Sequence, residues 1–160
     1  MEDKRITKTK RALKSALLEL LTTQAFDVIS ITELCKIANV SRITFYTHYK
    51  DKFALLDDIF NDMLIIGKEG YHRRQEENNP ENNLTQGYLN VLDSILSLYY
   101  ERYDFFQHVV PETNPYLAFR FYRILLDTVE SHTDKLKASY SLKYSARQIA
   151  GFICFGLFGF

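Results

Sequence analysis

The chain has 160 residues, of which 46% are hydrophobic and 25% charged, with six glycines and three prolines, so a disordered, collagen-like or linker-dominated protein is excluded. The net charge is zero, but residues 1–52 hold ten Lys and Arg against six Asp and Glu, a net of +4, and residues 53–160 hold ten against fourteen, a net of −4. A basic first third indicates a polyanionic partner, with chance as the alternative.

The first expected element is an amphipathic helix over residues 8–23, whose apolar residues recur at three- and four-residue spacing. Its first turns carry Lys8, Lys10 and Arg11. Cations at a helix N-terminus oppose the macrodipole, so these residues do not serve helix stability. A phosphate partner explains them better than a solvated basic arm does.

Three N-cap signals follow. Ser30 and Glu33 have the form of a capping box and open a short helix that ends near Ala38. Ser41 opens a second short helix, which ends near His48, and Asp51 caps a long one.

The polar segment 76–83 breaks helix and predicts a linker. Beyond it, helices are expected over 84–102, 104–110 and 115–137, and from residue 142 to the end. No strand hairpin, internal repeat or low-complexity tract is recognisable. The predicted fold class is therefore all-α.

The segment 30–52 has the dimensions of a helix-turn-helix. Asn39 in its turn tolerates a left-handed backbone, and the small Cys35 lets the two helices cross closely. The second helix would turn Phe45 and Tyr49 to the core and its polar side chains outward, where they can reach base edges or phosphates. Apolar contacts behind the pair are expected from Leu34, Ile37 and Val40.

The run VSRITFYTHYKDKFALL, residues 40–56, closely resembles the DNA-binding signature of TetR/AcrR-family transcriptional regulators. Residues 16–21 and 25–27 match that family's first helix and its exit, and residues 30–40 match its second. Two departures stand where the family usually has glycine, at Asn39 and at Ala25. An alanine at positive φ costs roughly 1 kcal/mol relative to glycine, so the first helix is expected to end differently here.

The resemblance is strong over about residues 8–66, and beyond them it holds only for a succession of helices. It implies a three-helix DNA-binding domain over 1–52, a long connecting helix over about 52–75, and a helical-bundle regulatory and dimerisation domain over 53–160. The family continues with one further helix, which we expect this chain to lack.

The same resemblance implies a set of DNA contacts. Arg42, Ile43 and Thr44 would read base edges, and the Arg42 guanidinium can bond O6 and N7 of guanine together. Tyr46 and His48 would contact phosphates or flanking bases, while the Lys52 ammonium and the free N–H groups beside it would meet a phosphate. The full set is Thr32, Ser41, Arg42, Ile43, Thr44, Tyr46, His48 and Lys52.

A homodimer on double-stranded, palindromic operator DNA is also implied, with recognition helices about 34–36 Å apart. The C-terminal segment is apolar all round and would supply the interface, with a helix in the monomer core as the alternative. The expected interface residues are Gly151, Phe152, Phe155, Gly156, Phe158 and Gly159.

No cofactor is expected, but family members enclose an apolar effector between their middle helices. Aromatic side chains at helical spacing are more often core than pocket, and both alternatives stay open here. The candidate pocket residues are Tyr99, Tyr103, His108, Arg120 and Tyr122. An apolar or aromatic small molecule would shift the spacing of the recognition helices, with the long fourth helix as the lever.

The expected function is therefore a sequence-specific DNA-binding regulator, most simply a ligand-responsive repressor. The alternative is a helical protein-interaction module on the same fold, for which Ile43 is the one hint. An enzyme is not expected, because the four histidines are scattered and neither a phosphate-binding glycine loop nor a serine nucleophile elbow is present. Cys35 and Cys154 form no disulfide framework and the longest apolar stretch, 149–160, is too short to span a bilayer, so a cytoplasmic protein with no membrane partner is expected.

Overall fold

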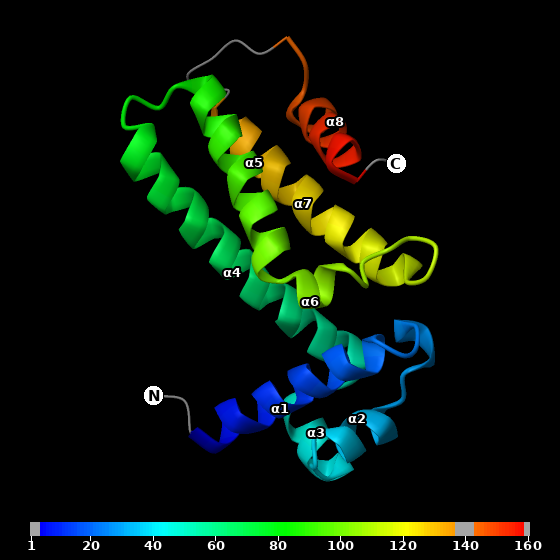
Figure 1. Cartoon of the computed structure of the whole chain (residues 1–160). Helices are drawn as coiled ribbons and strands as arrows, with labels where there is room; N and C mark the ends of the chain where they lie inside the picture. The colour runs from blue at the N-terminus through cyan, green and yellow to red at the C-terminus, as the bar shows by residue number, and fades with distance from the viewer. Residues whose placement is uncertain (1–3, 137–142, 159–160) are drawn as a thin grey trace.

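A computed structural model describes residues 4–136 and 143–158, and within these ranges it contains helices and no strand (Figure 1). The all-α class is thus confirmed. The elements are α1 (Lys4–Leu21), the 3-10 turn η1 (Phe26–Val28), α2 (Ile31–Ile37), α3 (Arg42–His48), α4 (Lys52–Asn78), α5 (Leu84–Glu101), α6 (Tyr103–Phe106), α7 (Pro115–Leu136) and α8 (Ala146–Phe158). None of these helices is both long and apolar enough to cross a membrane.

The helices form two groups that share α4 (Figure 1). α1, α2 and α3 gather around the start of α4 at one end of the molecule. α5 lies along the rest of α4, and α7 packs between this pair and α8. Since α4 belongs to both groups, a tilt of this helix moves one group relative to the other.

The three predicted N-caps are confirmed. The Ser30 hydroxyl accepts the backbone N–H of Glu33 at 3.2 Å, and the Glu33 carboxylate accepts the Ser30 N–H at 2.9 Å, which completes the capping box. Ser41 accepts the N–H of Thr44 at 3.0 Å, and Asp51 accepts that of Ala54 at 2.8 Å. Each cap satisfies an amide that its helix leaves unpaired.

The turn between α2 and α3 confirms the prediction for Asn39, whose φ is 53°. The backbone of Ala25 does not have the positive φ that would favour glycine, because its φ is −67° and its ψ is 149°. α1 ends at Leu21, and the turn after it brings the chain to Ala25 in an extended conformation that any residue adopts. Ala25 is therefore unstrained, and the first helix ends without a positive φ at this position, in line with the different helix end expected from the sequence.

The core of the first group follows the predicted pattern with one exception. Phe45 is fully buried and Tyr49 nearly so, and Leu34 and Cys35 are buried where α2 meets α3. Ile37, predicted to pack behind the pair, is 37% exposed. It is the last residue of α2, whereas the side chains of Ala38 and Val40 are partly buried and pack against the core.

The predicted linker is shorter than segment 76–83, because α4 continues to Asn78. An ordered turn follows, held by the buried amide of Asn79. Its Oδ1 accepts the N–H of Asn83 at 2.7 Å, and its Nδ2 donates to the carbonyl of Asn83 at 3.0 Å and to Gln75 at 3.1 Å. The turn therefore fixes how α5 returns along α4.

Aromatic side chains form the core of the second group. The Phe60 ring lies edge-on to Phe105 at 5.4 Å, and Phe106 contacts Phe121 at 4.7 Å between ring centroids. The short α6 supplies both Phe105 and Phe106, which are buried. This helix closes the end of the α4–α5–α7 group nearest to the three N-terminal helices (Figure 1).

Candidate functional site

The outer face of α3 is the first candidate site. Phe45 on the inner side of this helix and Tyr49, the residue directly after the helix, are 0% and 5% exposed, whereas Ile43 is 82% exposed and Tyr46 49%. Arg42 is exposed as well. The seven residues of α3 thus divide into a buried side that fixes the helix and an open side that carries a cation, an aromatic ring and an isolated aliphatic side chain.

Ser41 and Thr44 are already engaged with each other. Besides the cap, their two hydroxyl oxygens lie 2.9 Å apart in a hydrogen bond. Thr44 is half-buried and Ser41 exposed, so this pair orients the first turn of α3 next to Arg42.

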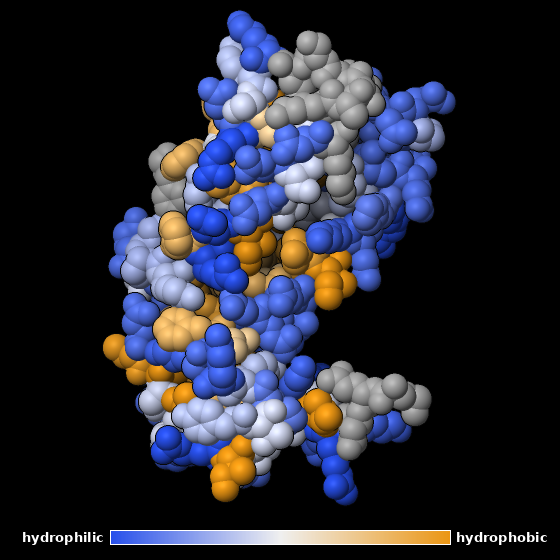
Figure 2. Space-filling model, turned by 180° about the vertical axis from the view of Figure 1, so that it is seen from behind, coloured by the Kyte–Doolittle hydropathy of each residue, from blue (hydrophilic) through white to orange (hydrophobic). Residues whose placement is uncertain are grey.

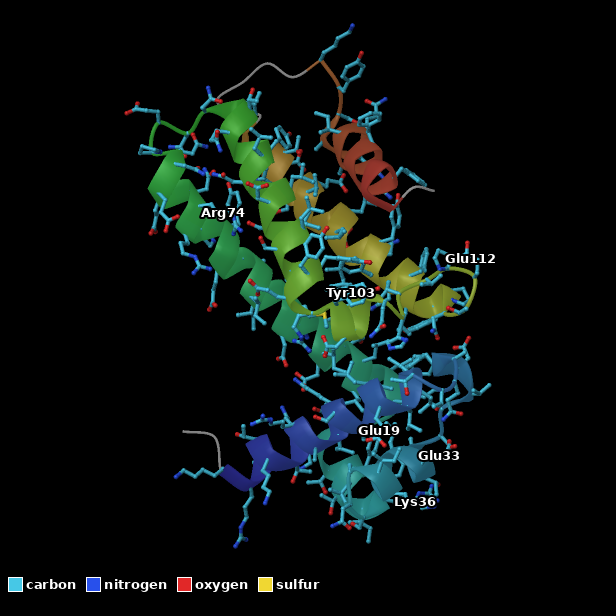
Figure 3. The ribbon with its side chains drawn as sticks, in the orientation of Figure 1. Glu19, Glu33, Lys36, Arg74, Tyr103 and Glu112 are labelled. Carbon is cyan, nitrogen blue, oxygen red and sulfur yellow. The ribbon has the colours of Figure 1, made fainter. Side chains whose placement is uncertain are left out.

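Two further predicted contacts lie on the neighbouring surface. Thr32 is exposed in the first turn of α2, and His48 is half-buried at the end of α3. Figure 3 shows Glu33 and Lys36 of α2 at the outer end of the three-helix group, far from Arg74 in the second group. Sequence reasoning did not select Lys36, although its charge belongs to the basic first third and its side chain is exposed.

Lys52 has a structural role that the sequence did not reveal. Its ammonium donates three hydrogen bonds, to the carbonyls of Phe26 at 2.9 Å, Asp27 at 2.7 Å and Ile29 at 2.8 Å, and lies 4.9 Å from the centre of the Phe26 ring. Partial burial lowers the pKa of this lysine. All three N–H donors are used, so we revise the expected contact between the Lys52 ammonium and a phosphate: at this end of α4 a phosphate contact would fall to backbone N–H groups.

An ionic network fixes the N-terminal group of helices on α4. The Tyr49 hydroxyl donates to Asp58 at 2.6 Å, and the Lys14 ammonium of α1 lies 3.1 Å from Asp58 and 2.5 Å from Asp62. Burial raises the pKa of Asp58, but hydrogen bonds from Tyr49 and Lys14 outweigh it and lower the pKa below its ordinary value. The network therefore holds α1 and the end of α3 against α4.

A second set of contacts joins α7 to the N-terminal group. The Phe26 N–H of η1 donates to the Asn114 side-chain oxygen at 2.7 Å, in buried surroundings, and the Phe26 ring stacks on Tyr116 at 5.6 Å. One turn further on, the Arg120 guanidinium pairs with Asp57 of α4 at 2.8 Å. The start of α7 therefore touches both η1 and α4.

A cavity of about 290 Å³ opens between α4, α5 and α7. It is the second candidate site. Most of its lining is apolar, with a smaller number of polar groups near one end. The lining residues are Phe60, Met63, Leu64, Gly67, Lys68, Tyr71, His72, Val91, Ser94, Ile95, Leu98, Phe121, Ile124, Leu125, Thr128, Ser131 and His132.

None of the five residues predicted to line a pocket contributes to this cavity. Tyr99 stacks on Phe106 at 5.5 Å, and Tyr103, at the start of α6, is 53% exposed (Figure 3). His108 lies in the loop after α6, where partial burial lowers its pKa.

The remaining two predicted pocket residues serve contacts between helices. Arg120 is the partner of Asp57, and the Tyr122 ring contacts Phe155 of α8 at 5.4 Å. Sequence reasoning missed Tyr71 and His132, whose rings meet edge-on at 5.3 Å, because nothing in the local sequence tells which side of α4 or α7 faces a cavity.

Four of the six predicted dimer residues, Gly151, Phe152, Phe155 and Gly156, lie on the part of α8 whose side chains the structure describes. This helix packs on α7 through Ala146 and Ala150, which are buried, while Phe152 is 83% and Phe155 51% exposed. A side chain added at Gly151 or Gly156 would meet no atom within 4 Å. The side chain of Phe158 and the whole of Gly159 lie outside the described residues.

Figure 2 shows the face opposite to that of Figure 1. Hydrophilic side chains cover most of it, with a group of hydrophobic ones near the middle. The first turns of α1, which carry the basic residues, project from the body at the end that holds α2 and α3. Their cations thus lie at the same end of the molecule as α2 and α3.

No protein-family profile matches this chain, but it is similar to known proteins in sequence and in structure. Over 58 residues the chain is 40% identical to the "Uncharacterized HTH-type transcriptional regulator YxbF" of Bacillus subtilis (strain 168), a match that covers 36% of this chain and only 14% of that relative. The solved structure of the "Dihydroxyacetone kinase operon activator DhaS" has a TM-score of 0.53 and 23% identity over 91% of this chain and 80% of its own, which shows a shared fold. Both names are those of transcription regulators rather than enzymes. The sequence match thus covers a small part of a relative named for a helix-turn-helix, and the structural match shows the fold alone.

Proposed function

We propose that this protein is a sequence-specific DNA-binding regulator of TetR type that acts as a homodimer on a palindromic operator, most simply as a ligand-responsive repressor. The observation that carries the proposal is the division of α3: Phe45 and Tyr49 are buried, while Arg42, Ile43 and Tyr46 face solvent. A short helix held from one side by aromatic residues, with a guanidinium on the other, suits the major groove.

Each exposed group has a chemical task in this proposal. Arg42 donates two hydrogen bonds to a guanine, and Ile43 makes apolar contact with the methyl group of a thymine. Thr32, Tyr46 and His48 contact the backbone or flanking bases. The basic residues of α1 add affinity that does not depend on sequence, because neutralised phosphates release counterions.

The dimer supplies the second recognition helix. The exposed aromatic side chains of α8, Phe152 and Phe155, would be buried between two copies of the chain. Two α3 helices about 34 Å apart then enter successive major grooves on one side of the operator.

Regulation would pass through α4 and the start of α7. The cavity is lined by α4 and α7, and α7 also contacts η1 through Asn114 and Tyr116. A ligand that binds better to one arrangement of these helices shifts the population toward it, and with it the spacing of the two recognition helices.

The test is selection of bound duplexes from a random pool, followed by affinity measurements on the selected site at several salt concentrations. We expect log Kd to change with log salt by about 0.9 per phosphate contact. The Arg42→Ala variant should lose about 1–3 kcal/mol and its preference at one base pair. Lys50→Ala, which removes an exposed cation outside α3, should weaken all duplexes about equally.

A second candidate function is a protein-interaction module on the same fold, which is favoured by the 82% exposure of Ile43. Such a module would bind no duplex at any salt concentration, and its partner would bind with little dependence on salt. Equal effects of Arg42→Ala and Lys50→Ala on every duplex would contradict the base-reading role of Arg42.

A further inference from the structure

The cavity between α4, α5 and α7 is polarised along its length. Phe60 and Phe121, stacked at 6.2 Å, lie at the end nearest to α6, whereas Tyr71, His72 and His132 lie at the other end. Phe60 and His72 are separated by about 18 Å along α4 at 1.5 Å per residue. An occupant therefore meets hydrocarbon at one end and polar groups at the other.

The polar end carries a cation. Lys68 and His72 line the cavity one helical turn apart on α4, their side chains also reach solvent, and no Asp or Glu is among the lining residues. Within the described ranges, Lys68 forms no ion pair and no hydrogen bond with the protein. A cation at the opening of a cavity whose lining holds no carboxylate attracts an anionic ligand.

A second cation lies directly behind the lining. The Arg74 guanidinium, labelled in Figure 3, donates to the Gly70 carbonyl at 3.1 Å and to the hydroxyls of Ser94 and Ser97 at 3.5 and 2.7 Å. All three partners are neutral, and Ser94 itself lines the cavity. The positive charge of Arg74 is therefore not cancelled and adds to that of Lys68.

Size limits the ligand. The cavity has a volume of about 290 Å³. This lies near the lower limit of small-molecule pockets, so a nucleotide or a large drug-like molecule is too big to be enclosed. A compact molecule with one charged group and a short apolar part fits.

We propose that the cavity binds a small monocarboxylic acid whose carboxylate meets Lys68 and His72 and whose aliphatic or aromatic part lies against Phe60 and Phe121. A hydrogen bond between an ammonium and a carboxylate is about twice as strong as one between neutral groups, and the tail adds affinity by leaving water. Binding of the acid does not depend on the proposed function, but its role as the effector rests on that function.

The experiment compares octanoate with 1-octanol, which has the same chain length without the charge. Binding to the full chain is measured by calorimetry in the absence of DNA. We expect octanoate to bind at least tenfold more tightly than 1-octanol. Lys68→Gln should remove most of this difference and leave 1-octanol binding within about twofold.

Two matched variants complete the design. Arg73→Gln removes an exposed cation of the same helix that does not line the cavity, so it should leave both affinities unchanged. Ile95→Trp fills the cavity and should abolish binding of both compounds; circular dichroism reports whether it folds.

Three results would overturn the proposal: no binding of octanoate, equal binding of octanoate and 1-octanol, or equal losses in Lys68→Gln and Arg73→Gln. Since no DNA is present, these results are separate from the duplex test. A chain that binds octanoate but no duplex supports the carboxylate site and contradicts the proposed function. A chain that binds a duplex but no octanoate supports the proposed function and contradicts the carboxylate site.

Discussion

Lys52, the first residue of α4, donates hydrogen bonds from its ammonium to three carbonyl oxygens of the η1 region. Replacing Lys52 with Met keeps the side-chain volume but leaves these partly buried acceptors without a donor. We expect the free energy of unfolding to fall by about 1–3 kcal/mol, as measured by urea denaturation. Lys52→Arg should not restore it, because a planar guanidinium cannot direct donors to three converging carbonyls.

Lys50→Ala is the matched control for stability, since that lysine is exposed two residues away. It should change the free energy of unfolding by no more than a few tenths of a kcal/mol. If Lys52→Met has the same free energy of unfolding as the parent chain and loses only affinity for duplexes, the Lys52 ammonium contacts a phosphate and the argument is contradicted.

Asn39 gives a prediction about backbone conformation. At a φ of 53° an alanine is disfavoured, whereas glycine is free to adopt this angle. Asn39→Ala should therefore destabilise the chain by about 1 kcal/mol, and Asn39→Gly by much less. Thermal unfolding of the two variants, in the same buffer, checks the order; equal stabilities would contradict the argument.

These local features were the ones that could be predicted from sequence. Ser30, Ser41 and Asp51 each act on an amide three residues away, so the motif itself contains both partners. Lys52 could not be assigned in this way, because its acceptors lie 23 to 26 residues earlier in the chain. Its three partners depend on how α4 docks, which no local pattern specifies.

At the scale of elements, α4 is held to α1 and α3 through Asp58. Its pKa in the folded chain lies below the ordinary value of 3.8, so it contributes stability above that pH, and the contribution is lost as the pH falls through the folded-state pKa. Asp58→Asn should lower the free energy of unfolding by about 1–2 kcal/mol near pH 7 and by much less near pH 3. Urea denaturation at both pH values measures the difference.

The control is Asp93→Asn on α5. Asp93 is exposed and forms no ion pair within the described part of the chain. Its replacement should change stability little at either pH. A deficit of Asp58→Asn that persists unchanged at low pH would mean that packing, not charge, accounts for it.

The positions of the helices could be predicted from the sequence, but which side of each middle helix faces the cavity could not. Periodicity identifies an apolar stripe, and Phe105, Phe106 and Phe121 indeed form core. Whether a residue such as Tyr71 or His132 faces a cavity depends on the distance between three helices, and that distance is set by the Asn79 turn and by α6. For this reason the five predicted pocket residues lie elsewhere.

For the whole molecule, the exposed aromatic side chains of α8 predict self-association. Phe152→Glu places a charge where the proposed interface would be apolar, so the dissociation constant of the dimer should rise about tenfold or more. Sedimentation velocity over a range of concentrations measures it. The affinity of the variant for duplexes with two half-sites should also fall, since one recognition helix alone binds weakly.

Tyr100→Glu on α5 is the matched control, because Tyr100 is also an aromatic residue with 76% exposure. It should leave sedimentation unchanged. If both variants, or neither, change self-association, α8 is not the specific interface.

The bond between Phe26 and Asn114 joins residues that are 88 positions apart. During synthesis the N-terminal helices leave the ribosome long before Asn114 does, and local contacts close faster than distant ones. The three N-terminal helices would thus be assembled while their connection to α7 is still missing. In a nascent chain at that stage, no contact would yet couple the position of α7 to these helices, and the coupling would arise only when Asn114 reaches Phe26.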